Sequence, residues 1–247
     1  MPIPTEPIGS LPREKGLSGA AAVKAVIARL EALGSPVVTD GEQTKPSFVT
    51  YPMAGLSLAP EGVTIPFADG HTRRLPVLTG GPFRYGVYAD SYLSEAKKHA
   101  KVPVKQAVIA VSAMSLLYPD KGLPGYSRDA FLADLVAEGE KDIRRCLDAG
   151  AHCVQVDFTE GRLSLKLDPS GGVLKQFVAL NNRVLERFTD RERARIGVHT
   201  CPGGDHDSTH SADVDYAGFL PEYFKLKAGN FYLELSGEKD RARVLKL

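Results

Sequence analysis

The sequence predicts an α/β fold, a (β/α)8 TIM-type barrel that is incomplete at the C-terminus, with about seven strands present in 247 residues. Short apolar runs alternate with longer segments in which apolar residues recur every three or four positions, which is typical of parallel βαβ units. Polar residues follow nearly every predicted strand, and barrel active sites collect at the carboxyl ends of the strands. This placement favours the barrel over a doubly wound open sheet, which the alternation also allows.

The predicted strands are short, apolar and bounded by turn residues. They are residues 6–11, 36–42, 75–81, 104–112, 152–158, 195–201 and 230–235. A closed barrel needs an eighth strand, whereas residues 238–247 have a helical pattern. We therefore expect strand edges without partners, and either association of the chain with itself as a homo-oligomer or poor activity.

The predicted helices each have one apolar face. They are residues 19–34, 89–100, 127–150, 171–188, 214–229 and 238–247. No internal repeat, low-complexity tract or linker divides the chain, so we expect a single domain over residues 1–247.

The composition excludes several classes of partner. A net charge of +1 gives no electrostatic reason to expect nucleic acid or an acidic membrane surface. No apolar run approaches the roughly 20 residues that cross a bilayer, and the first residues lack the pattern of a signal peptide. The three cysteines are too few for a disulfide framework, which together with the missing signal predicts a cytoplasmic protein. Cys146 and Cys153 are predicted to be small core residues.

His199 and Cys201 indicate half of a metal site. Both lie at the end of the predicted strand 195–201, and alternation along a strand places their side chains on the same face. Imidazole and thiolate are zinc donors, although two ligands do not make a zinc site. The polar loop that follows contains further candidates, which we expect to be mostly solvated rather than ligands. These are Asp205, His206, Asp207 and His210.

Seven motifs, in order, resemble those of one enzyme family. They are "PIGSLPR", "VVTDGEQ", "LPVLTGG", "PVKQAVIAVSAMS", "CVQVDF", "VHTC" and "FYLELS". The sequence is similar over almost its whole length to the catalytic C-terminal barrel of cobalamin-independent methionine synthase and its shorter single-barrel relatives. The resemblance implies an enzyme that methylates the thiol of homocysteine to give methionine.

The resemblance also implies which residues bind metal and substrate. His199, Cys201 and Glu234 would be zinc ligands, and the bound zinc would favour the thiolate form of the substrate. Glu42 and Asp157 would hold the ammonium group of homocysteine. Its carboxylate would bind Ser10 and the backbone around Gly9. From the residues alone, Asp157 is also a candidate helix N-cap, Glu234 an ordinary acidic residue at a strand end, and Glu160 a solvated loop acid.

Two departures from the family leave the methyl donor and the last zinc ligand open. The family has a further zinc-binding cysteine beyond the seventh strand, and no cysteine follows Cys201 here. The family's folate-stacking tryptophan is also missing, because the chain contains no Trp and Tyr118 lies near that place. The sequence therefore does not decide between methyltetrahydrofolate and another methyl donor.

Three alternative functions stay open. The first is a related zinc-thiolate alkyl transferase that uses another thiol or donor, as in epoxyalkane–coenzyme M transferases. The second is a uroporphyrinogen decarboxylase-like enzyme, which would leave His199 and Cys201 without a role. The third is a non-catalytic, truncated barrel.

Overall fold

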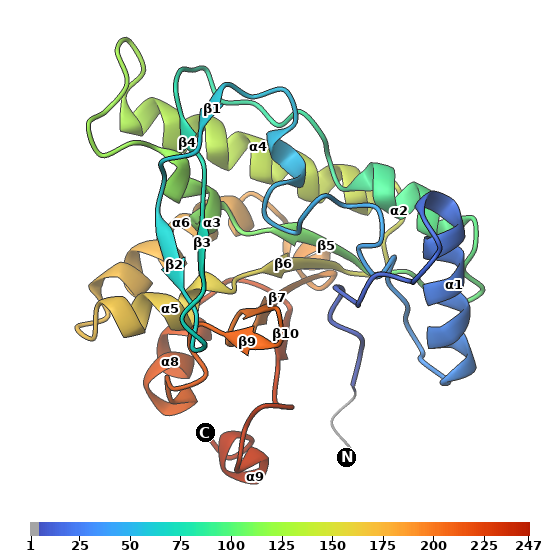
Figure 1. Cartoon of the computed structure of the whole chain (residues 1–247). Coiled ribbons are helices and arrows are strands. Elements are labelled where there is room, and N and C mark those ends of the chain that lie inside the picture. Colours follow the sequence, from blue (N-terminus) through green and yellow to red (C-terminus); the bar gives the residue numbers. More distant parts are fainter. Residues whose placement is uncertain (1–4) are drawn as a thin grey trace.

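The computed structural model describes residues 5–247 and has a parallel sheet at its centre (Figure 1). Four strands lie in the order β10-β7-β6-β5. Their bounds are Gln106–Ile109 for β5, Val154–Asp157 for β6, Ile196–Thr200 for β7 and Asn230–Leu233 for β10. All three pairings are parallel, so the carboxyl ends of the four strands meet at one edge of the sheet. The predicted strands 104–112, 152–158, 195–201 and 230–235 are confirmed in shorter form.

A fifth segment extends the sheet beside β5. Val38 forms a parallel bridge with Val104, and its N–H donates to Pro103 O at 3.0 Å. The predicted strand 36–42 is therefore reduced to one bridging residue. Gly41 and Glu42 have φ values of 62° and 54°, and this left-handed backbone turns the chain away from the sheet.

The predicted strand 6–11 is wrong. The segment has no strand assignment, and it is held by single contacts: Gln155 Nε2 donates to Ile8 O at 2.7 Å, and Leu11 N–H donates to Gly41 O at 3.2 Å. Proline at position 7 has no N–H to offer a parallel neighbour, which weakens any ladder at this place.

The predicted parallel strand 75–81 is also wrong. Only Val77–Leu78 (β4) is extended, and it pairs antiparallel with Leu58–Ala59 (β1) outside the central sheet. The predicted α/β class is confirmed, with four parallel strands at the centre. Within residues 5–247 no closed barrel is present, so the predicted incomplete TIM-type barrel with about seven strands is not confirmed.

The bounds of the helices are Gly19–Ala32 (α1), Asp90–Lys97 (α2), Val111–Met114 (α3), Arg128–Asp148 (α4), Glu160–Leu167 (α5), Gly172–Leu185 (α6), Asp190–Arg193 (α7), Tyr216–Tyr223 (α8) and Arg241–Val244 (α9). The helices α1, α2, α4, α6, α8 and α9 follow the predicted amphipathic segments with shorter ends, whereas the short helices α3, α5 and α7 were not predicted. Two short 3-10 helices span Tyr51–Met53 and Ser115–Leu117. Among residues 5–247, no helix combines the length and the apolar character that a membrane span requires.

The two faces of the sheet have different chemistry. Val156 and Val198 are register partners, and both lie with Gly139 of α4 and Val184 of α6. Because side chains alternate along a strand, Asp157 and His199 lie on the opposite face. The apolar face of the sheet is therefore covered by helices, and the polar face carries the candidate site.

Two small hairpins lie near the carboxyl ends of the strands (Figure 1). One pairs Thr64–Pro66 (β2) with Thr72–Arg74 (β3), and the other pairs Gly204–Asp205 (β8) with Ser208–Thr209 (β9). They touch each other, since Ala68 N–H donates to Thr209 O at 2.9 Å.

Candidate active site

The pairing of β6 with β7 brings two predicted site residues together. Asp157 and His199 are directly opposite each other in the parallel register, and both are buried. Tyr232 of β10 is the register partner of His199 on its other side. The predicted site residues of two neighbouring strands therefore lie side by side at the carboxyl end of the sheet.

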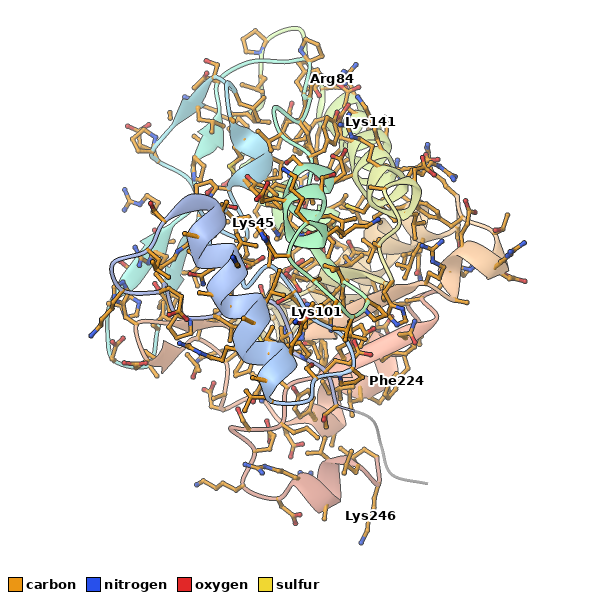
Figure 2. The ribbon with its side chains drawn as sticks, turned by 90° about the vertical axis from the view of Figure 1, so that its right-hand side faces the viewer. Lys45, Arg84, Lys101, Lys141, Phe224 and Lys246 are labelled. Atoms are coloured by element: carbon orange, nitrogen blue, oxygen red, sulfur yellow. The ribbon has the colours of Figure 1, made fainter. Side chains whose placement is uncertain are left out.

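Glu42 approaches this place from the turn after Val38, and it has a cationic partner that the sequence did not reveal. Lys45 Nζ donates to Glu42 Oε1 at 2.9 Å and to Ala107 O of β5 at 2.8 Å. The lysine side chain is 1% exposed and lies inside the molecule (Figure 2), with its Nζ 4.7 Å from the ring centre of Tyr51. Such contacts compensate the cost of burying an ammonium group.

The charges around Lys45 determine its protonation. Burial lowers the pKa of Lys45, but the attraction of Glu42 and Asp40 outweighs burial and raises the pKa above its ordinary value. Lys45 is therefore a permanent cation. Burial raises the pKa of Asp40, and Lys45 opposes that change.

Asp157 is a buried acid and not a helix cap. The N-cap position of α5 is occupied by Thr159, so the alternative role of Asp157 as an N-cap is wrong. Gln155 Nε2 donates to Asp157 Oδ1 at 2.7 Å. Burial raises the pKa of Asp157 to about 7, and the nearby charge of Glu42 acts in the same direction.

Glu160 is also buried, so its interpretation as a solvated loop acid is wrong. It begins α5, is 6% exposed, and accepts a hydrogen bond from the hydroxyl of Ser112. Asn181 Nδ2 donates to the same hydroxyl oxygen at 2.8 Å. Burial raises the pKa of Glu160 to about 8, and its Oε2 has no hydrogen-bond partner among the described residues. The group is therefore protonated at neutral pH.

His199 is buried, and Cys201 is partly buried. Burial lowers the pKa of His199 to about 3, so the imidazole is neutral and keeps a free lone pair. Its Nδ1 is buried and has no hydrogen-bond partner in the described chain. Burial raises the pKa of Cys201 to about 12, and Gly203 N–H donates to its Sγ at 3.3 Å.

Glu234, the third predicted zinc ligand, binds its own turn. Its Oε1 accepts hydrogen bonds from the Ser236 hydroxyl and, at 3.2 Å, from Gly237 N–H. Among residues 5–247, no three His, Cys, Asp or Glu side chains are arranged to hold a metal ion. The donor chemistry of His199 and Cys201 fits zinc, whereas Glu234 fits only after release from its turn.

A cleft of about 500 Å³ is lined by Glu42 and Glu160, but not by Asp157 or by the predicted metal ligands His199, Cys201 and Glu234. Ser10, Glu42, Lys45 and Glu160 line it from the sheet side, whereas Phe67 belongs to the hairpin that covers it. This volume is typical of a small-molecule site. Ser10 is exposed to the cleft and Gly9 is buried beside it, with Gly9 O accepting from Thr39 Oγ1 at 3.3 Å.

The loop after Cys201 is solvated at His206 and Asp207, as predicted, whereas Asp205 is partly buried and His210 is buried. His206 and Asp207 have left-handed φ values of 47° and 63°. His210 is buried against Gly203, where an added Cβ would lie 1.7 Å from His210 Nε2. Burial lowers the pKa of His210 to about 4, so this histidine is neutral.

Hydrogen bonds between charged side chains connect the β2–β3 hairpin, which covers the cleft, to the loop after Cys201. Asp205 accepts hydrogen bonds from Arg73 and, at 3.2 Å, from His71 Nε2. The bond from Arg73 lowers the pKa of Asp205 to about 2. The His71 ring is stacked on Phe67 with ring centres 4.4 Å apart. Hairpin and loop thus form one cover over the cleft.

Three other sequence predictions are resolved by their position. Cys146 and Cys153 are free and buried, as predicted. Tyr118 is buried and donates to Tyr126 O at 2.6 Å, so it does not line the cleft in place of a folate-stacking residue.

Lys45 is the principal residue that sequence reasoning missed. A lysine three positions after Glu42 reads as an ordinary solvated residue, because its burial depends on Ala107 O and Tyr51. The signal in the sequence was the pair of acids two positions apart, Asp40 and Glu42, which need a cation when they are buried.

Comparison with known structures supports the fold. One similar structure is a B12-independent methionine synthase from Shewanella sp. W3-18-1 in complex with selenomethionine. The TM-score is 0.63 and the sequence identity 19%, over 90% of this chain and 68% of that one. A protein assigned as a vitamin-B12-independent methionine synthase from Listeria monocytogenes is similar with a TM-score of 0.55 and 18% identity, over 80% of this chain and 64% of that one. The chain thus spans about two thirds of the length of these structures.

Comparison of the sequence with known families and proteins assigns this chain to no family. No protein-family model matches the sequence, and no curated protein matches it. At these identities the structural likeness shows the fold, and the function must be argued from the site.

Proposed function

We propose that this chain is a zinc-dependent methyltransferase that methylates the thiol of homocysteine to give methionine. The observation that carries the proposal is the register of β6 and β7, which places Asp157 beside His199. An acid suited to a substrate ammonium group thereby lies next to an imidazole suited to a metal ion. The likeness to methionine synthase structures supports the same function.

In this proposal, His199, Cys201 and Glu234 hold the zinc. Glu234 would exchange its hydrogen bonds with Ser236 and Gly237 for the metal. Bound zinc would favour the thiolate of the substrate, which is the nucleophile in methyl transfer. Because the Cys201 thiol has a pKa of about 12, metal binding would release its proton and would weaken as pH falls.

The remaining residues bind the substrate and manage protons. Asp157 and Glu42 would hold the ammonium group of homocysteine, and Ser10 with the backbone at Gly9 its carboxylate. Glu160 lines the cleft and is protonated at neutral pH. With methyltetrahydrofolate as donor, it is therefore the candidate acid for protonating the nitrogen that the methyl group leaves. A sulfonium donor would leave as a neutral thioether and would need no proton.

Methionine formation tests the proposal. The zinc-loaded protein is incubated with homocysteine and methyltetrahydrofolate or, separately, S-adenosylmethionine. We expect methionine with one of the donors, and at least a hundredfold less with Cys201→Ser, because a hydroxyl is a far poorer zinc ligand than a thiolate. Absence of methionine with both donors, or equal activity of Cys201→Ser, would contradict the proposal.

The Lys45–Glu42 pair favours a second candidate. Glu42 already has an ammonium partner at 2.9 Å, so a thiol that lacks an amino group would also suit the cleft. This corresponds to a zinc-thiolate alkyl transferase acting on another thiol. Comparing homocysteine with 4-mercaptobutanoate, which lacks only the amino group, separates the two. Faster alkylation of 4-mercaptobutanoate would favour the second candidate.

A further inference from the structure

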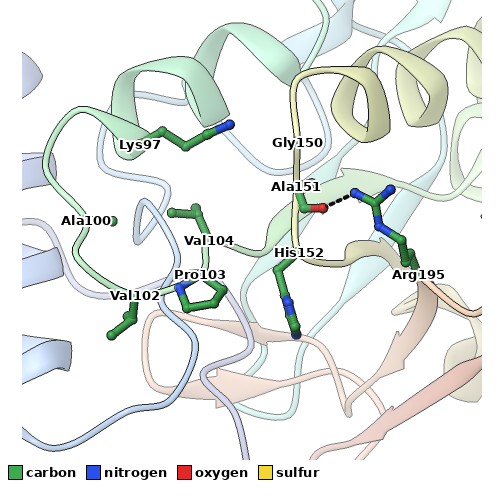
Figure 3. A pocket seen from close by; sticks show the side chains of 9 residues that line it. All are labelled: Lys97, Ala100, Val102, Pro103, Val104, Gly150, Ala151, His152 and Arg195. Carbon is green, nitrogen blue, oxygen red and sulfur yellow. Dashed lines mark hydrogen bonds between the residues drawn. The ribbon is translucent and has the colours of Figure 1, made fainter.

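A second hollow, of about 590 Å³, lies at the amino ends of the strands (Figure 3). Its wall comprises the end of α2, residues 102–104 before β5, residues 150–152 before β6, and Arg195 before β7. Since these strands are parallel, the hollow lies at the opposite end of the sheet from Asp157 and His199. It does not belong to the candidate active site.

Among residues 5–247, three basic side chains and no carboxylate line the hollow. Lys97, His152 and Arg195 are its three basic residues. Within residues 5–247, neither Lys97 nor Arg195 has an Asp or Glu partner at ion-pair distance, and both bind backbone carbonyl groups instead. Lys97 and Arg195 therefore line the hollow as solvent-exposed cations without a carboxylate partner in that range.

The turn at Gly150 holds these two cations in place. Lys97 Nζ donates to Ala149 O at 2.6 Å, and Arg195 Nη2 donates to Ala151 O. Gly150 has φ +80°, and an added Cβ would lie 2.8 Å from Lys97 Nζ. An ammonium group has three donors and a guanidinium has five, so most of their donors remain free for a ligand.

The rest of the wall is apolar. Val102, Pro103 and Val104 form one side, and the cation-bearing turn lies across from them (Figure 3). The volume lies in the range of sites for small organic molecules. A ligand with an anionic head and an apolar body matches both parts.

We propose that this hollow binds a small phosphate monoester, with the phosphate attracted by the basic residues of its wall, Lys97, His152 and Arg195, and the carbon skeleton against Val102 and Pro103. A phosphate monoester carries about −1.5 to −2 charges at neutral pH, which matches the two cations. A monocarboxylate would leave one cation uncompensated. The planar fork of arginine also binds phosphate oxygens in pairs. This site is independent of the methyltransferase proposal.

Calorimetric titration tests the site with three probes: phenyl phosphate, inorganic phosphate and benzoate. We expect phenyl phosphate to bind most tightly, because only it combines the dianion with an apolar body. Lys97→Gln and Arg195→Gln should each weaken its binding at least about tenfold. Lys175→Gln, which removes an exposed lysine of α6 outside the hollow, is the matched control and should leave binding unchanged.

Nuclear magnetic resonance of His152 in the unmodified protein gives a readout that does not depend on any variant folding. Phenyl phosphate should shift the His152 imidazole signals. The proposal is overturned by absence of binding at millimolar concentration, by unshifted His152 signals, or by equal weakening in all three variants, which would indicate general charge attraction. Benzoate binding as tightly as phenyl phosphate would overturn the assignment to phosphate.

Discussion

Lys45 Nζ lies 2.9 Å from Glu42 Oε1, so the cleft contains a buried ion pair beside the predicted substrate site. The two side chains are 1% and 5% exposed. Arg13 donates to the carbonyl groups of both residues and holds the turn that carries them. The ion pair fixes one carboxylate oxygen of Glu42 and keeps the positive charge of Lys45 near Asp157.

Removal of Lys45 should strongly destabilise the protein. Lys45→Met leaves Glu42 as a buried carboxylate without a partner, which costs about 3–5 kcal/mol of unfolding free energy. Chemical denaturation measures the change. The matched control is Lys225→Met, because Lys225 and Glu222 form an exposed pair with the same spacing, and its loss should cost less than about 1 kcal/mol. Equal losses in the two variants would contradict a structural role for the buried pair.

Gly203 should tolerate no side chain. Its φ is +69°, and an alanine Cβ there would lie 1.7 Å from His210 Nε2. Gly203→Ala should therefore lower the unfolding free energy by at least about 2 kcal/mol, from backbone strain and displacement of a buried ring. Gly204→Ala is the control, because the nearest atom to its Cβ is 4.0 Å away. A Gly203→Ala protein as stable as Gly204→Ala would show that the loop rearranges freely.

Glu160 should make stability depend on pH. Its pKa is about 8 in the folded protein against 4.5 ordinarily, so between these values the folded state keeps a proton that the unfolded chain has lost. The unfolding free energy therefore falls as pH rises from about 4.5 to 8, by a few kcal/mol. Glu160→Gln should make this fall shallower in denaturation series across that range. Glu61→Gln, at an exposed position, should leave the slope unchanged, and an unchanged slope in Glu160→Gln would refute the assignment.

Hydrophobic periodicity predicted the strands and helices whose own residues show a clear apolar pattern. The strands β6 and β7 have alternating or continuous apolar residues, and the helices α1, α2, α4, α6 and α8 have one apolar face, so each could be located without its neighbours. The short helices α3, α5 and α7 were not predicted. The same pattern at residues 75–81 failed, because a short apolar run does not specify its partner. It pairs with Leu58–Ala59 instead of the central sheet.

Asp157 and His199 could be placed at the carboxyl ends of their strands from the sequence, whereas contacts between distant segments could not be predicted. Cys201 lies one residue beyond β7, and the metal site at His199 and Cys201 stays a prediction. Glu160 looked solvated because its partner Ser112 lies 48 residues earlier, and the carbonyl acceptor of Lys45 at Ala107 lies 62 residues away. Burial of such charges depends on tertiary contacts that composition and spacing do not contain.

Asp157 should contribute to substrate binding and not to metal binding. Asp157→Asn removes one charge-assisted hydrogen bond to the ammonium group of homocysteine, which should weaken binding by about 1.5–3 kcal/mol. Calorimetric titration with homocysteine measures this loss, and metal analysis of the same sample should find the zinc content unchanged. Unchanged homocysteine affinity would show that Asp157 has only a structural role.

The metal content of Cys201→Ser, compared with Cys146→Ser, tests the central claim most directly. Cys146 is a buried cysteine on α4, so its replacement controls for the loss of a thiol as such. We expect about one zinc per chain in the unmodified protein and in Cys146→Ser, and little in Cys201→Ser, because a hydroxyl is a far poorer ligand than a thiolate. Equal zinc in Cys201→Ser and Cys146→Ser, or none in the unmodified protein, would contradict a zinc-thiolate methyltransferase.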